Sequence, residues 1–263
     1  MLSNLLQKYH ETHRAEILFA NSGIARKAGH VQRVKGLIKD YPNFFLDSSM
    51  DFELALICAE HHDDGRLLQY EQTGKLDDNF FSHQSAGLQM LHNFCLANKV
   101  PPTFAPQDIQ ILGDVMMYHG KLEQISSTII SPQSMPYVKA ISKADILENS
   151  MSCVSYLKQN YYGNEKNLSY EHYISAEVWE FYTTGTLFSK IDFCKTYDEY
   201  ILFAGTLVIS SIKKYDTLAK KLFRSPGFGY PSILEGFHDI FDELLLKEDA
   251  EKAYQIMYYY VMD

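Results

Sequence analysis

Six histidine and aspartate side chains between residues 30 and 145 have the types expected of metal ligands, and they lie at or near the ends of predicted helices or face the core. They are His30, His62, Asp63, His83, His119 and Asp145. Mixed imidazole and carboxylate ligands suit a divalent transition metal such as Mn, Fe, Co, Ni or Zn. Such a set could hold one or two ions, and two ions about 3.5–4 Å apart would activate a water for displacement at phosphorus.

Three basic residues lie near these ligands in the sequence and could neutralise a bound phosphate. They are Arg66, Lys121 and Lys143. Arginine and lysine make strong, charge-assisted hydrogen bonds to phosphate oxygens. The ligands and the cations together predict a site for a small phosphorylated molecule.

The surroundings of the His-Asp dipeptide carry more information than the dipeptide itself, because it occurs twice. His238-Asp239 lies in a later helical stretch without matching partners, and we interpret it as surface. His62-Asp63 instead ends an apolar helix, and Gly65-Arg66 follows it at once. His83 then starts the next helix. We therefore place the site at His62-Asp63.

The elements that must position these residues are predicted to be helices. Apolar residues recur at helical spacing, and Ser, Pro and Gly occur where helices begin or end. The helices expected around the ligands are Ile24–Lys39, Phe52–His62, His83–Ala97, Pro106–His119 and Tyr137–Tyr161. The polar segment Arg66–Phe81 predicts a loop with one turn of helix.

The rest of the chain continues the same helical pattern. The later helical stretches are Ala176–Thr183, Thr196–Phe223, Ser232–Leu246 and Glu248–Val261. A segment rich in Tyr, Asn and Gly near residues 160–169 is the best internal boundary. The sequence thus predicts an all-α fold, with a metal-binding helical core over residues 1–160. Helices over residues 161–263 are expected to pack on that core in one compact unit.

Composition narrows the classes of function. The 263 residues are 46% hydrophobic and 22% charged, which is typical of a folded globular protein. The net charge of −9 argues against binding a nucleic acid polymer. No apolar run is long enough to span a bilayer, so we expect no membrane partner.

Location and assembly are predicted from weaker signals. The first residues lack a secretory signal, and the four cysteines form no Cys-x-x-Cys pair, which favours the cytoplasm. The tyrosines at positions 258–260 suggest two alternatives, a contact in a homo-oligomer or packing on the core of the same chain.

This series of residues resembles the HD-domain superfamily of metal-dependent phosphohydrolases. That superfamily has an early His, then His-Asp, then one or two His, then a late Asp. The segment HDDGRLLQYEQTGKLDDNFFSHQSAG, from His62 to Gly87, is similar to a subgroup with His-Asp-x-Gly-Arg, a Gly-centred loop and His-x-x-x-Gly. Lys143-Ala-Asp-Ile-Leu is similar to its Asp-Ala-Asp-x-Leu stretch. The resemblance covers roughly residues 20–157 and implies an HD-domain helical bundle with additional C-terminal helices.

The resemblance also implies roles for individual residues. The residues that match its four-ligand core are His30, His62, Asp63 and Asp145. Asp63 would bridge the metals, while His83 and His119 would hold a second metal or contact phosphate. Arg66 would bind phosphate or form a structural ion pair. The implied cofactor is one or two divalent ions, with Mg added to the metals named above.

The leading hypothesis is hydrolysis of a phosphomonoester or phosphodiester of a small, nucleotide-like substrate, with Asp63, Arg66 and Lys143 as catalytic residues. The alternative is a non-catalytic nucleotide-sensing or interaction module on the same scaffold. It is motivated by Asp64 and Lys143, which stand where the subgroup has an apolar residue and an aspartate. A third hypothesis is a metal-dependent oxygenase on a similar carboxylate–histidine site.

Overall fold

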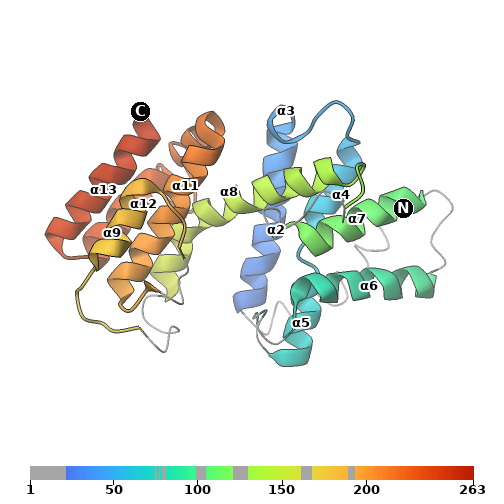
Figure 1. Cartoon of the computed structure of the whole chain (residues 1–263), viewed down its shortest axis with the longest axis horizontal. Coiled ribbons are helices and arrows are strands. Elements are labelled where there is room, and N and C mark those ends of the chain that lie inside the picture. The colour runs from blue at the N-terminus through green and yellow to red at the C-terminus, as the bar shows by residue number, and fades with distance from the viewer. Residues whose placement is uncertain are drawn as a thin grey trace. The chain divides into compact units, whose positions relative to one another are not determined.

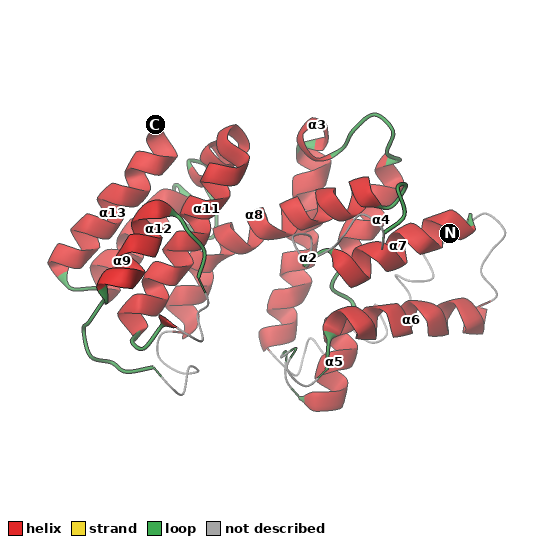
Figure 2. Ribbon diagram, viewed as in Figure 1, coloured by secondary structure: helices red, strands yellow, loops and turns green. Residues whose placement is uncertain are grey.

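The computed structural model is all-α, as the sequence predicts (Figure 1). It describes residues 22–74, 76, 78, 81–98, 105–120, 130–160, 168–188 and 193–263. Over these residues the regular elements are helices, and the β pairing is limited to two isolated bridges (Figure 2). The helices are α2 (Ser22–Asp40), α3 (Pro42–Phe45), α4 (Phe52–His61), α5 (Gly65–Thr73), α6 (His83–Asn98), α7 (Pro106–Tyr118), α8 (Met135–Asn160), α9 (Ala176–Thr184), α11 (Tyr197–Phe223), α12 (Ile233–Leu244) and α13 (Lys247–Met262).

The chain divides into two compact units, Met1–Glu148 and Asn149–Asp263. The division falls inside α8, so the N-terminal part of this helix belongs to the first unit. All six predicted ligands lie in the first unit. Whether the C-terminal helices pack on the core in one compact unit stays a prediction.

The first unit is held together by apolar faces at helical spacing. Helix α2 packs against α4, α4 against α7, and α7 against α6. The inward face of α2 is formed by Val31, Val34, Leu37 and Ile38. Burial of such a stripe is the main force that docks a helix. It also fixes the rotation of α2 about its axis, and with it the direction of the remaining side chains.

Local capping fixes two helix starts near the site. Asp51 accepts a hydrogen bond from the Leu54 amide at 2.8 Å at the start of α4. The Ser82 hydroxyl accepts one from the Ser85 amide at 3.4 Å at the start of α6. A capping oxygen satisfies an amide that the helix leaves unpaired. Ser82 therefore caps α6 and places His83 at its first position, where the sequence predicts that this helix starts.

Helix α5 lies in the segment for which a loop with one turn was predicted, and that prediction is wrong. The polar sequence of α5 shows no apolar stripe, because its buried side chain makes hydrogen bonds instead of apolar contacts. Gln69 is fully buried and donates to the Asp78 carboxylate at 2.9 Å. The helix ends at Thr73, because Gly74 after it adopts the left-handed conformation (φ 66°) that is common after a last turn.

Helices α5 and α6 approach to backbone contact. A Cβ on Gly65 would overlap the His83 carbonyl oxygen and the Gly87 amide nitrogen. A Cβ on Gly87 would in turn lie 3.5 Å from the Gly65 nitrogen. The missing side chain at Gly65 therefore brings His83 next to the turn that carries His62 and Asp63.

The second unit is built around α11, which packs against α9, α12 and α13. Thr196 and Glu199 form a capping box at its start, each accepting a hydrogen bond from the backbone amide of the other, at 3.2 and 3.3 Å. Tyr182 of α9 is fully buried, and its hydroxyl donates to the Ala253 carbonyl at 2.6 Å. No helix in the described part of the chain has the length and apolar character needed to cross a membrane.

The tyrosines near the C-terminus lie outside the core of their unit. Tyr258 and Tyr259 are 42% and 62% exposed. The Tyr260 hydroxyl donates to the Thr183 carbonyl at 2.9 Å. The side chains that α13 buries are Ala250, Ala253, Met257 and Val261. Of the two alternatives, packing on the core is confirmed for the helix, because α13 packs against α11 and α12 through these side chains. A contact of the exposed tyrosines between copies stays a prediction.

The contact at Gly65 can be tested by substitution. Gly65→Ala should lower the free energy of unfolding by about 1–3 kcal/mol, because the new Cβ would overlap backbone atoms of α6 that cannot move away without strain. Gly36→Ala in α2 is the matched control, since a Cβ there meets nothing within 4 Å. It should be neutral or stabilise by up to about 1 kcal/mol. Chemical denaturation measures both, and equal stabilities would contradict the close approach.

Candidate metal centre

The six predicted ligands come from separate elements and meet inside the first unit. His30 comes from α2, His62 and Asp63 from the α4–α5 turn, and His83 from α6. His119 directly follows α7, and Asp145 lies in α8. The first five are buried, and the Asp145 side chain is 16% exposed. The helices therefore bring ligands far apart in the sequence to one enclosed place.

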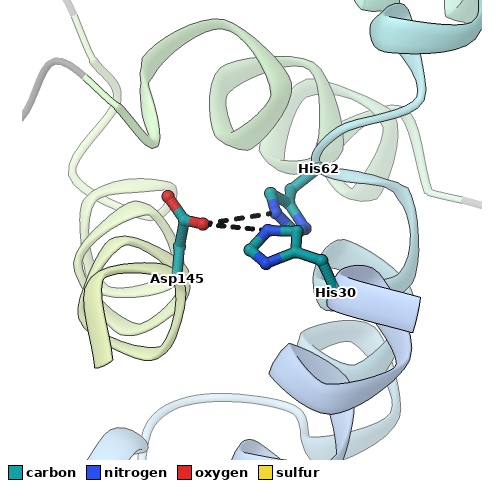
Figure 3. A group of neighbouring side chains, drawn as sticks. All are labelled: His30, His62 and Asp145. Carbon is teal, nitrogen blue, oxygen red and sulfur yellow. Dashed lines mark ion pairs between the residues drawn. The ribbon is translucent and has the colours of Figure 1, made fainter. Parts of the chain in front are cut away.

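A first group joins α2, the α4–α5 turn and α8 (Figure 3). One carboxylate oxygen of Asp145, Oδ1, lies 3.0 Å from His30 Nε2 and 3.9 Å from His62 Nε2. The ligand atoms of these three residues all lie within 4.8 Å of one another. A single ion could therefore contact all three.

A second group consists of His62, Asp63 and His119, whose ligand atoms also lie within 4.8 Å of one another. His119 Nε2 lies 3.8 Å, and His83 Nε2 3.3 Å, from Asp63 Oδ1. The other oxygen, Oδ2, lies 3.8 Å from His30 Nε2. The two oxygens of Asp63 thus face different parts of the cluster, as a bridging carboxylate requires.

All four histidines are held in the same orientation. In each, Nδ1 meets an acceptor outside the cluster and Nε2 faces the carboxylates. The acceptors are the Glu148 carboxylate for His30, the Ala59 carbonyl for His62 at 2.7 Å, the Asp78 carboxylate for His83 at 2.7 Å and the Val115 carbonyl for His119 at 3.0 Å. A neutral imidazole that donates from Nδ1 keeps its lone pair on Nε2. This is the arrangement in which an imidazole binds a metal.

Two nitrogen atoms in the cluster bear on whether its residues fit a metal ion. His30 Nε2 and His62 Nε2 are buried and make no hydrogen bond. The Asp145 oxygen at 3.0 Å from His30 Nε2 lies outside hydrogen-bond geometry. A buried polar atom without a partner costs about 1–3 kcal/mol. A divalent cation would satisfy both atoms, so the residues present fit a metal.

Charge in the cluster is set by burial and by close partners. Burial opposes ionisation of Asp63, but the Lys27 ammonium and the neighbouring histidines hold its pKa well below the usual range. Burial lowers the pKa of His62 and His119, and it lowers the pKa of His83 to about 4. These three imidazoles are neutral and Asp63 is ionised at neutral pH, which is the state that binds metal.

His30 differs from the other three. Burial lowers its pKa, but the Asp145 and Glu148 carboxylates outweigh burial and raise it to about 9. In the metal-free protein His30 is therefore protonated at neutral pH. A metal that binds at Nε2 would displace that proton.

Sequence reasoning missed Glu148. This carboxylate is fully buried in α8 and contacts His30 Nδ1 and Arg33 Nε, the latter at 2.5 Å. The feature of the sequence that could have revealed Glu148 is its helical spacing from a ligand, because residues three apart share a helix face. Glu148 follows Asp145 by three residues, as Arg33 follows His30.

Sequence reasoning also missed Asp78, which fixes both His83 and Arg66. Its carboxylate accepts hydrogen bonds from the His83 amide at 3.0 Å and from both terminal nitrogens of Arg66 at 3.1 Å. Arg66 therefore has the structural ion pair that was one of its two expected roles. Its Nε lies 3.8 Å from Asp63 Oδ1, and phosphate binding stays a prediction.

Of the other two predicted cations, the structure describes only Lys143, whose amine lies apart from the cluster. The Lys143 amine lies 5.8 Å from the centre of the Phe44 ring. Side chains two residues apart on a helix point about 200° apart, so Lys143 and Asp145 face different directions. Contact between Lys143 and a substrate stays a prediction. Lys121 lies outside the described residues.

Two departures from the HD pattern satisfy each other. His61 Nδ1 and the Asp64 carboxylate lie 2.8 Å apart, and both side chains are buried. The Nδ1 of His61 is therefore taken up by Asp64, beside the cluster. Asp64 takes a place expected to be apolar because it has this polar partner.

Comparison with known proteins leaves the relationship of this chain to them open. No protein-family model, curated protein or solved structure matches it.

Metal binding can be tested through His62, the residue common to both groups. Mn, Co, Ni or Zn ions should raise the melting temperature of the metal-free protein, because a ligand that binds only the folded state stabilises it. His62→Gln should lose the shift and the bound metal. His92→Gln replaces an exposed histidine of α6 and should keep both. Elemental analysis and thermal unfolding measure the outcome, and full metal content in His62→Gln would contradict the assignment.

Glu148 should act on the metal through His30. Glu148→Gln should weaken metal binding about 10- to 100-fold, the usual effect of losing such a partner. Glu60→Gln is the control, because this carboxylate lies outside the cluster and accepts a hydrogen bond from Lys35 Nζ at 2.7 Å. The Glu60→Gln protein should bind metal like the wild type. Calorimetric titration gives the affinities. NMR of the His30 ring nitrogens reports whether the proton still resides on Nδ1, and an unchanged ring would count against this role.

Proposed function

We propose that this protein is a metal-dependent phosphohydrolase of the HD type that hydrolyses a phosphomonoester or phosphodiester of a small, nucleotide-like molecule. The observation that supports the proposal best is the convergence of four similarly oriented imidazoles on two carboxylates, Asp63 and Asp145. Such a cluster, buried and with two unpaired nitrogens, is costly unless it binds a cation.

The ligand set indicates which metals suit the site. Four imidazoles with two carboxylates favour Mn, Fe, Co, Ni or Zn over Mg, which prefers oxygen ligands. A bound divalent ion supplies Lewis-acid activation of water and neutralises charge on the phosphate. One or two ions are compatible with the two overlapping groups, which share His62.

The chain's own residues have distinct tasks in this proposal. Asp63 offers one oxygen to each part of the cluster and is the candidate bridging ligand. Asp145 draws His30 and His62 together from α8. Arg66, held rigid by Asp78, directs its Nε toward Asp63 and would stabilise negative charge on the reacting phosphate.

The substrate and the setting follow from composition and from the resemblance. A nucleotide-like substrate is what the HD-type pattern implies, and the negative net charge disfavours a long polyanion. We propose a cytoplasmic enzyme, because the four scattered cysteines suit a reducing compartment. Assembly into a homo-oligomer is part of the same proposal, with the exposed tyrosines of α13 as the candidate contact.

Removing Asp63 tests the proposal directly. Asp63→Ala should fold, lose metal and lose hydrolysis, because both parts of the cluster depend on this carboxylate. Asp239→Ala is the matched control, since it alters the other His-Asp dipeptide at an exposed position of α12. Phosphate release is measured over a panel of nucleotides and phosphodiesters with Mn, Mg, Co and Ni. Hydrolysis retained in Asp63→Ala would refute the proposal.

The same experiment separates the alternatives. Stoichiometric metal and nucleotide binding without turnover in the wild type would favour the sensing or interaction module. Oxygen uptake and a di-iron spectrum after loading with iron would favour the oxygenase.

A further inference from the structure

A lysine that the sequence analysis did not select lies at the centre of the cluster. Lys27 precedes His30 by three residues on α2, so the two side chains share a helix face. Its Nζ lies 2.8 Å from Asp63 Oδ2, and its side chain is only 20% exposed. Among the described residues, Lys27 is the cation that lies closest to Asp63.

Arg66 approaches the same carboxylate from the other side. Its Nε lies 3.8 Å from Asp63 Oδ1 and is buried without a hydrogen-bond partner. Its terminal nitrogens are already bound to Asp78 and Gln69. The guanidinium group is therefore fixed in place, with one donor still free for an acceptor.

Lys27, Asp63 and Arg66 line one small cavity together with the apolar side chains of Val31 and Leu67. Its volume is about 20 Å³, enough for one oxygen-sized atom. An ammonium group has three N–H donors, and Asp63 takes one of those of Lys27. Asp64 also lines the cavity and is paired with His61 Nδ1 at 2.8 Å, so two cations face two carboxylates there. The cavity therefore offers a phosphoryl oxygen the N–H donors of Lys27 and Arg66, and no excess of positive charge.

We propose that Lys27 and Arg66 Nε bind a non-bridging oxygen of the substrate's phosphoryl group, an inference that rests on the proposed function. Lys27 then takes the role that the sequence analysis gave to Lys143, whose amine lies over the Phe44 ring. The arrangement selects a substrate whose phosphorus carries at least one free, charged oxygen, as in phosphate monoesters and diesters. A neutral ester would leave both donors unpaired.

Binding of inorganic phosphate to the Mn-loaded protein tests this site without relying on turnover. Lys27→Met should weaken phosphate binding, measured by calorimetry, about 10- to 100-fold, the effect expected for a lost charge-assisted hydrogen bond. Metal content should stay the same. If a substrate is turned over, its KM should rise in parallel.

Two further variants control for structure. Lys35→Met removes a lysine of the same helix that pairs with Glu60 at 2.7 Å, and should leave phosphate binding unchanged. Lys27→Arg keeps the charge and should retain most of the affinity, so it gives an answer even if Lys27→Met does not fold. Thermal unfolding checks each variant.

The outcomes separate this inference from the proposed function. Phosphate binding by a well-folded Lys27→Met protein at the wild-type affinity would overturn the inference, whatever the turnover. Loss of metal from the Lys27→Met protein would also overturn the inference, and so would a wild-type protein that binds no phosphate. Lys27-dependent phosphate binding in a protein that hydrolyses no ester would support the site and refute the proposed function.

Discussion

Asp63 is a carboxylate that folding removes from water, and the first unit is arranged around the groups that keep it ionised. A buried charge is strongly destabilising unless close partners compensate it. Lys27 Nζ lies 2.8 Å from one oxygen and Arg66 Nε 3.8 Å from the other. Lys27 belongs to α2 and Arg66 to α5, while Asp63 lies in the α4–α5 turn. The helices must therefore dock before the carboxylate is compensated, which couples the stability of this unit to the geometry of its site.

The charge of the metal-free cluster is not spread evenly over its members. Burial keeps His62, His83 and His119 neutral, so positive charge resides on His30 and on the two cations beside Asp63. His30 is the exception because two carboxylates contact it from α8. A divalent ion would take over much of this compensation. The metal-free and metal-bound states of the site therefore differ in where protons are held as well as in what is bound.

Local signals sufficed for most helices and for the six cluster residues, but not for their supporting partners. Ser82 marks the start of α6 because a hydroxyl there caps free amides, whatever the rest of the fold does. Helix α5 was missed because its buried residue is Gln69, a polar side chain that no apolar pattern reveals. Lys27 and Glu148 lie at helical spacing from ligands, yet such spacing is common among 57 charged residues, 24 basic and 33 acidic. To single out Lys27 and Glu148, one must know how α2 is rotated relative to α8. Packing sets that rotation, and local sequence does not.

The pair formed by His61 and Asp64 has a consequence for sequence variation. Both side chains are buried, and each supplies the other with a partner at 2.8 Å. A protein that kept the histidine and replaced the aspartate with a leucine would leave an imidazole nitrogen without this acceptor inside the turn. Replacement of both by apolar residues would avoid that penalty. Positions 61 and 64 should accordingly covary among homologues, being polar together or apolar together, while the two ligands between them, His62 and Asp63, stay the same.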